Sequence, residues 1–322
     1  MGHHDRTEPT SSHSGGPESL LQDGACLRRA DTGVDEDAPL GGTHEVTVHR
    51  GRGEGDRDAD LQEVVGEGGH DHGALPSTIP GIFAGIKPQD LPDPVPNSNT
   101  VEVRVSPELA GVVALGVVHA EDLLVRPSAP DVEEEAERLA EALRAQYRGL
   151  PPSEIEALGP ARELFRRVGE DPTKTRPSSE ALLRRVLRGE ALPRINSLVD
   201  AVNLCSLSFL LPIGLYDLDR MHGPVIIRLG RLGEGYDSLG KGFFRAEGRV
   251  VVADDAGPFG GPVNDAQRTA VTQHTRRALA LVFAPSSYPR AHLEDHTRVL
   301  GRWIVRSSSG RIVQAHVLPK VG

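Results

Sequence analysis

The sequence has little cysteine, few aromatic residues and no long apolar run. Its 322 residues include two cysteines and one tryptophan, and aromatic residues make up 4% of the chain. The two cysteines, Cys26 and Cys205, do not provide the disulfide framework that small secreted domains use. No stretch is apolar enough to cross a bilayer, and no hydrophobic signal-peptide core stands at the start. We therefore predict a cytoplasmic protein without a membrane partner.

Several motifs of common enzyme classes are also missing. The sequence holds no Gly-x-Ser-x-Gly, no Walker loop and no dinucleotide fingerprint, so we expect no nucleotide cofactor. Histidines gather in the first third of the chain, but the cluster His70-Asp-His72 brings only two imidazoles close together, in a glycine-rich segment. Structural zinc sites usually need four ligands at recognisable spacing, so we expect no metal site.

Charge is unevenly distributed along the chain. The net charge of -10 argues at first against nucleic acid as a partner. Residues 1–100, however, hold 18 acidic and 7 basic side chains, and the remainder holds 28 acidic and 29 basic ones. Residues 160–195 carry nine basic and five acidic side chains. This basic stretch is suited to phosphates, although a solvated helix face would have the same composition.

The first third differs from the rest in composition. Residues 1–95 are dominated by Gly, His, Asp, Glu and Ser, contain few large apolar residues and end in a proline-rich segment. Such a composition is typical of disorder, so we predict a disordered segment over 1–95 and one folded domain over 96–322.

The folded part is predicted to place helices before most of its strands. Strands are expected at 101–105 and 112–118, helices at 131–149, 153–159, 160–169, 177–189 and 196–210, strands from 224, 249, 278 and 312 onward, and a helix at 292–305. Residues 230–242 are expected to form a loop and residues 257–262 an irregular segment. This order favours an α+β fold.

The chain is organised around residues 175–217, which encode two of these helices. The second is apolar over most of its circumference and stops before Pro212, so it should be buried. Asn196, Asp200 and Asn203 fall at i, i+4 and i+7 and share one face. A polar stripe on a buried helix needs partners, either neighbouring backbone groups or a ligand.

This region carries a family resemblance. The series Ile195-Asn-x-x-Val-Asp-x-x-Asn203, followed by Pro212-x-x-x-Tyr-Asp217, resembles the B3/B4 editing domain of the phenylalanyl-tRNA synthetase β subunit. The opening Thr175-Arg-Pro-Ser is similar to stand-alone B3/B4 proteins. The resemblance covers residues 161–285 and implies a β-rich core flanked by helices. Aminoacylation is not expected, because the chain has no room for a synthetase catalytic core.

The resemblance also implies a hydrolytic site. In the editing domain the position of Asn203 contacts the misattached amino acid, and the site acts on an aminoacyl ester with water. We therefore predict a deacylase of aminoacyl-tRNA, or of a small aminoacyl compound, with four catalytic candidates: Asn203, Asp217, Thr269 and Thr272. The predicted substrate- and RNA-binding residues are Arg176, Arg194, Asn196, Asp200, Gly214, Tyr216 and Arg268. RNA, not DNA, is the expected nucleic acid.

The sequence departs from the editing pattern at the residues that recognise tyrosine. The position of the family's histidine holds Gly214, and that of its glutamate falls at Ala280 or Leu281. Loss of this pair should abolish discrimination for a tyrosine hydroxyl. A non-catalytic module that binds RNA or an amino-acid derivative is therefore the alternative. For Asn196 and Asp200 the alternative is helix capping, and for the Arg268–Thr275 segment it is a hydrogen-bonded loop.

Overall fold

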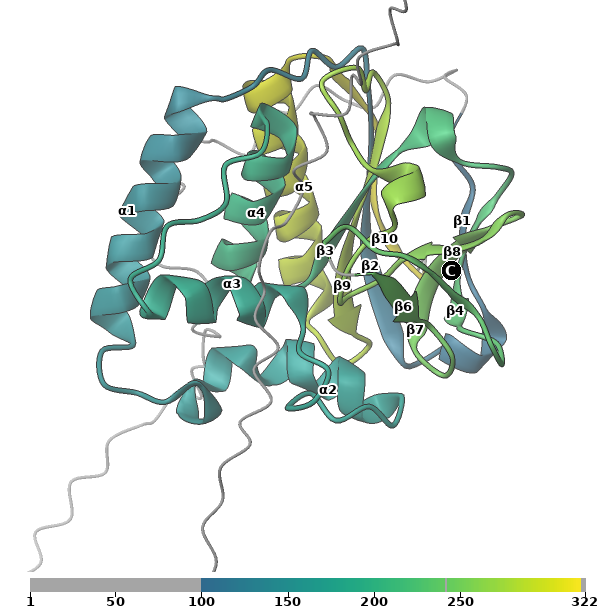
Figure 1. The fold of residues 1–322 in the computed structure, drawn as a ribbon, viewed down its shortest axis with the longest axis horizontal. Coiled ribbons are helices and arrows are strands. Elements are labelled where there is room, and N and C mark those ends of the chain that lie inside the picture. Colours follow the sequence, from purple (N-terminus) through teal and green to yellow (C-terminus); the bar gives the residue numbers. More distant parts are fainter. Residues whose placement is uncertain (1–99, 241, 320–322) are drawn as a thin grey trace, which may run out of the picture.

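The structure is a computed structural model that describes residues 100–240 and 242–319. The described chain forms an α+β fold, as predicted from the sequence (Figure 1). The predictions for residues 1–95, including the histidine pair, lie outside the described residues. The helices of the described chain are α1 (Pro130–Gln146), α2 (Gly159–Arg167), α3 (Ser178–Leu187), α4 (Ser197–Phe209) and α5 (Arg290–Ser308).

The strands of the described residues form three sheets. The main sheet is antiparallel, in the order β10-β2-β9-β3, and a second sheet has the order β1-β4-β7-β8. A small hairpin pairs β5 with β6. The bounds are β1 (Val103–Val105), β2 (Val113–Glu121), β3 (Ile213–Asp217), β4 (Val225–Leu229), β5 (Gly235–Asp237), β6 (Phe243–Arg245), β7 (Val250–Asp254), β8 (Gly257–Gly260), β9 (Ala278–Pro285) and β10 (Arg311–Leu318).

The main sheet lies between the helices and the second sheet (Figure 1). Strand β9 is buried along its whole length, and its two faces serve different cores. Ala278, Ala280, Val282 and Ala284 pack in the core that contains α1, α3, α4 and α5, whereas Leu279, Leu281 and Phe283 pack in the core of α2 and the second sheet. Successive side chains of a strand point to opposite faces, so alternating small and large residues place the small ones toward the helices and the large ones toward the second sheet.

Helix α4 is the most buried helix of the helical layer. It contacts α1, α3 and α5, and at its C-terminal end the chain passes directly into β3. Asn196 caps its start, because the side chain accepts a hydrogen bond from the Val199 N–H at 2.9 Å. Leu210 ends it in a left-handed conformation, with φ of 53°. The connection places the polar face of α4 beside the first residues of β3.

Three local predictions were wrong. Residues 257–260 form strand β8, because their backbone pairs with β7 despite two glycines and a proline. A strand, β5, lies within the expected loop at 230–242. The segment Asp131-Val-Glu-Glu predicts a capping box at the start of α1, but Pro130 occupies the first helical position and Ala129 is the N-cap. Asp131 instead pairs with Arg306 at 2.6 Å.

Two glycines make room for one aromatic side chain at the start of the second core. A Cβ built on Gly214 would collide with the hydroxyl of Tyr216, and one built on Gly260 would collide with the Tyr216 ring. Tyr216 is fully buried and packs edge-on against Phe259, with ring centroids 5.0 Å apart. The rigid ring has no free space into which it can move.

We predict that Gly214→Ala destabilises the fold, because overpacking a closed core typically costs about 1–3 kcal/mol. Gly159→Ala is the matched control: Gly159 is the first residue of α2, and a Cβ there meets nothing within 4 Å. Urea unfolding followed by circular dichroism would measure both. A Gly214→Ala protein as stable as the Gly159→Ala protein would contradict the packing described here.

Candidate active site

The larger of two neighbouring cavities has a volume of about 470 Å³. It lies where α3 and the face of α4 that carries Asn203 meet β3, the β5–β6 hairpin and the segment after β8. Its larger apolar lining side chains are Leu182, Val199, Val202, Ile213, Leu215, Leu239, Phe243, Phe244, Val263 and Val271. A cavity of this size accommodates a small organic group.

One side of this cavity is strongly basic. Its lining cations are Lys174, Arg176, Arg184, Arg185, Arg188 and Arg249, against a single lining carboxyl group among the described residues, Asp265. Some of these cations have partners at the rim: Arg188 pairs with Glu190 at 2.6 Å, and Arg249 pairs with Glu170 at 2.6 Å. The balance of the lining is nevertheless positive.

The excess positive charge is greatest around Glu180. This buried carboxylate accepts hydrogen bonds from Arg162 and Arg184, and Arg176 lies 3.9 Å from it. Three guanidinium groups therefore share one carboxylate. Burial and the neighbouring Arg184 lower the pKa of Arg176, and within the described chain the buried Nε of Arg176 has no hydrogen-bond partner. A bound anion would neutralise this cluster.

Asp265 supplies the acidic group of the cavity wall. Its Oδ2 accepts a hydrogen bond from the Leu215 N–H at 3.4 Å, and its buried Oδ1 has no regular partner among the described residues. The Tyr216 hydroxyl lies close by, since a Cβ on Gly260 would touch both groups, but it falls short of a regular hydrogen-bond geometry. Burial raises the pKa of Asp265 to about 7, although Tyr216 and two backbone N–H groups act to lower it. A carboxyl group with this pKa exchanges protons near neutral pH.

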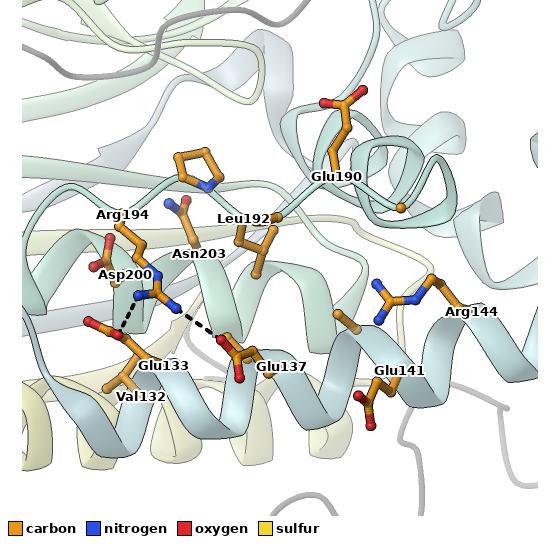
Figure 2. Close-up of a pocket in the computed structure, with 15 residues that line it drawn as sticks. Val132, Glu133, Glu137, Glu141, Arg144, Glu190, Leu192, Arg194, Asp200 and Asn203 are labelled. Carbon is orange, nitrogen blue, oxygen red and sulfur yellow. Dashed lines mark hydrogen bonds and ion pairs between the residues drawn. The ribbon is translucent and has the colours of Figure 1, made fainter.

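Asn203, like Arg176, is a sequence-predicted residue that lines this cavity with an unpaired donor. Its buried Nδ2 has no hydrogen-bond partner in the described part of the chain. It also lines the smaller cavity, between α1 and α4, and Figure 2 shows it there beside Asp200. An unpaired amide donor in a cavity wall is suited to a carbonyl oxygen.

The other predicted residues near α3 and α4 either have structural partners or line one of the two cavities. Asn196 is the N-cap of α4, and Asp200 Oδ1 accepts a hydrogen bond from the Ile195 N–H at 2.9 Å. Arg176 lines the larger cavity. Arg194 lines the smaller one instead and bridges Glu133 and Glu137 of α1 (Figure 2).

The remaining predicted residues lie outside the lining of both cavities. Asp217 accepts hydrogen bonds from the Thr275 hydroxyl at 2.7 Å and from the Asp219 N–H at 3.0 Å. Arg268 makes a two-pronged ion pair with Asp254. The Thr269 hydroxyl donates to the Phe259 carbonyl, and Thr272 Oγ1 accepts from the His274 N–H. Gly214 and Tyr216 lie behind Asp265. The functional roles of all these residues remain predictions.

Asp265 is a site residue that sequence reasoning misses. The segment Gly257-Pro-Phe-Gly-Gly-Pro indicates an irregular loop, and this interpretation draws no attention to the polar pair Asn264-Asp265 after it. The available signal is a glycine pair shortly before two acceptor side chains, since glycine permits close approach of backbone and ligand.

The geometry thus defines an α+β domain with a cavity that is basic on one side and has Asp265 as its one lining carboxyl group among the described residues. Residues 160–288 match the family model described as the B3/4 domain, so the chain contains a B3/4-like domain. The match agrees with the motif region expected at 161–285.

One similar solved structure is the N-terminal fragment of the phenylalanyl-tRNA synthetase beta-subunit from Pyrococcus horikoshii, with 12% identity and a TM-score of 0.37. The alignment covers 72% of this chain and 58% of that chain, so this chain spans less than two thirds of its relative. A similarity at this level carries no weight of its own. No curated protein matches the sequence.

Within the described ranges, no group of three His, Cys, Asp or Glu side chains is arranged to hold a metal ion. Nor is any helix of residues 100–240 or 242–319 long and apolar enough to cross a membrane.

The buried carboxyl of Asp200 leads to a prediction about stability. Burial raises its pKa from 3.8 to about 6. The folded state therefore holds the proton more tightly than the unfolded chain, and stability falls as the pH rises from the unfolded pKa through the folded one. Because an asparagine side chain cannot ionise, Asp200→Asn should raise the free energy of unfolding at pH 8 by up to about 3 kcal/mol.

Urea unfolding of both proteins at pH 8 and at pH 3.5 would test this. The gain should shrink toward zero at the lower pH, where Asp200 is mostly protonated in both states. An equal difference at the two pH values would contradict the assignment.

Proposed function

We propose that the larger cavity hydrolyses an aminoacyl ester, carried by the 3′ end of a tRNA or by a small aminoacyl compound. The observation that carries the proposal is one cavity with both a cationic side and a carboxyl group whose pKa is about 7. The B3/4-like domain, in which the sequence resembles an editing domain, supports the same class of substrate.

The cationic side would hold the phosphates next to the ester. Arg176 and Arg184 share Glu180 with Arg162, so the cluster has positive charge to spare. Lys174 lies at the same rim and is exposed. Arginine and lysine at the mouth of a cavity are the usual partners of phosphate oxygens.

The chemical step would use Asp265 and Asn203. Ionised Asp265 takes a proton from a water molecule, whose oxygen attacks the ester carbonyl carbon. The Nδ2 group of Asn203 donates to the carbonyl oxygen as it becomes negative. The carbon–oxygen bond to the ribose then breaks, and protonated Asp265 returns the proton to the leaving ribose oxygen. The products are the free amino acid and the free hydroxyl, and Asp265 is restored.

The wall of the cavity favours an apolar amino-acid side chain. Val199, Val202 and Ile213 offer no group that recognises a hydroxyl. Gly214, which replaces the family's histidine, adds no donor and instead makes space for Tyr216. This arrangement supports a substrate other than a tyrosyl ester.

We expect selective ester loss when the protein is incubated with a panel of correctly and wrongly charged tRNAs. Asp265→Asn should lower the rate by about 10²–10⁴, since it removes the proton acceptor. Asn203→Ala should lower it by about 10²–10³. The rate of the unmodified protein should rise with pH through about 7, as Asp265 ionises. Scintillation counting of remaining charged tRNA measures each rate.

Asp219→Asn is the control, because Asp219 is exposed and its ion pair with Arg277 lies at the surface. Asp217→Asn distinguishes this site from the one predicted by motif alone. If Asp217→Asn abolished turnover and Asp265→Asn did not, the catalytic centre would lie outside the cavity. If no member of the panel lost its ester, the proposed hydrolase function would be wrong.

The second candidate function is binding without chemistry. It is favoured by Gly214, which occupies the position of a residue that contacts substrate in the resembled editing site. In this case the cavity would bind the 3′ end of an RNA, or an amino-acid derivative, without turnover.

We expect tRNA affinity to fall steeply with salt under either function. Lys174→Ala should weaken binding and reduce the slope of log K against log salt by about one, because one phosphate contact is lost. Arg104→Ala is the matched control, since Arg104 lies in the second sheet and pairs with Glu102. Fluorescence anisotropy at several salt concentrations would measure both. Equal slopes for the two variants would contradict the assigned RNA path.

A further inference from the structure

A second, smaller cavity of about 260 Å³ lies between α1, α4 and the segment 189–194 (Figure 2). It takes no part in the hydrolysis proposed above, although Asn203 and Pro193 line both this cavity and the larger one. Its character is opposite, because most of its charged lining groups are acidic.

The acidic groups come from three elements. Glu133, Glu137 and Glu141 are spaced four residues apart on α1, so they form one row along the helix with about 6 Å between turns. Glu190 and Asp200 complete the set. The lining contains two cations among the described residues, Arg144 and Arg194, against these five carboxyl groups.

Asp200 is an incompletely satisfied carboxyl group in the wall of this cavity. The residue is 8% exposed, and its Oδ1 accepts the Ile195 N–H. Its buried Oδ2 has no hydrogen-bond partner within the described residues. The nearby Arg194 is engaged with α1, at 2.8 Å from Glu133 and 2.9 Å from Glu137 (Figure 2). Oδ2 is therefore an acceptor without a donor, which is a rare and unfavourable state for a buried carboxylate.

The apolar part of the wall restricts the kind of cation. Val132, Ala136 and Ala140 line the α1 side, and Leu192 faces them from the segment 189–194. These groups suit a hydrocarbon chain and not a hydrated metal ion, and the described residues contain no three-ligand metal cluster. An ammonium group has three donors for carboxylate oxygens, and the methylene chain behind it packs on alanine and leucine.

We propose that this cavity binds a linear alkylammonium ion, with its ammonium group on Asp200 Oδ2 and its alkyl chain along Ala136 and Ala140. The row on α1 adds a second anchor, because Glu137 and Glu141 lie one and two turns beyond Glu133. A diamine with a four-carbon chain can place one ammonium on Asp200 and the other in this row. The elevated pKa of Asp200, caused mainly by burial, is consistent with a carboxyl group that lacks its cation.

Isothermal titration calorimetry of the full chain with putrescine, at pH 8 and low salt, tests the proposal. We expect saturable binding at one site. Butanediol, which has the same chain length and no charge, should not bind. Asp200→Asn should lower the putrescine affinity at least about tenfold, and Glu137→Gln should lower it by a smaller factor, since Glu137 is exposed.

Glu134→Gln is the matched control. Glu134 lies on α1 beside the row but outside the cavity lining, and its side chain is 72% exposed. Its removal changes the net charge of the protein by the same amount and should leave the affinity unchanged. If Glu134→Gln and Asp200→Asn lowered the putrescine affinity equally, the effect would come from general surface charge, and the proposed site would be wrong.

Ala136→Leu tests the cavity without changing any charge. Leucine is a good helix former and would fill the space along α1, so we expect putrescine binding to be lost while the melting temperature stays close to that of the unmodified protein. Absence of putrescine binding to the unmodified protein would overturn the proposal. So would a putrescine affinity of Asp200→Asn and Ala136→Leu equal to that of the unmodified protein. None of these outcomes depends on ester hydrolysis.

Discussion

The burial of β9 on both faces is the constraint on which the rest of the structure depends. Strand β9 pairs with β2 on one side and with β3 on the other. Its alanines allow the helical layer to approach closely, and its leucines and phenylalanine fill the space under the second sheet. Because β3 is held in register by β9, Ile213 and Leu215 face the cavity, while Tyr216 points into the opposite core. The position of Asp265 follows, since the Leu215 N–H donates to it.

Buried polar groups in the helical layer and in the cavity walls differ in whether they have hydrogen-bond partners. Several buried polar groups in the helical layer have partners: Ser197 bonds to Ser308, and Ser206 bonds to the Leu211 carbonyl. Unsatisfied buried atoms occur in the cavity linings, at Arg176, Asp200, Asn203 and Asp265. Unsatisfied buried atoms also occur away from the cavities, for example at Ser106 and His119. Only those in the cavity walls lie where a ligand could supply the missing partner.

The order of helices and strands could be predicted from periodicity, because α4, β9 and α5 have long apolar patterns that only one kind of element satisfies. The capping of α4 by Asn196 is likewise one of the two alternatives that the sequence leaves open. In the candidate site, Asn203 could be predicted because it lies on such an element, and Arg176 because it belongs to the basic stretch at 160–195. Asp265 follows a glycine-rich strand whose pairing with β7 depends on tertiary contacts. The pairing of Asp217 with Thr275, 58 residues later, depends on tertiary structure in the same way.

Asn203 lies in the wall shared by two cavities of opposite charge. Arginines dominate the charged lining on one side, and glutamates with Asp200 dominate on the other. The segment 189–194 separates them, and Pro193 contributes to both linings. The charge of the lining therefore changes sign across this wall. The two cavities therefore suit ligand groups of opposite charge, although they share Asn203 and Pro193.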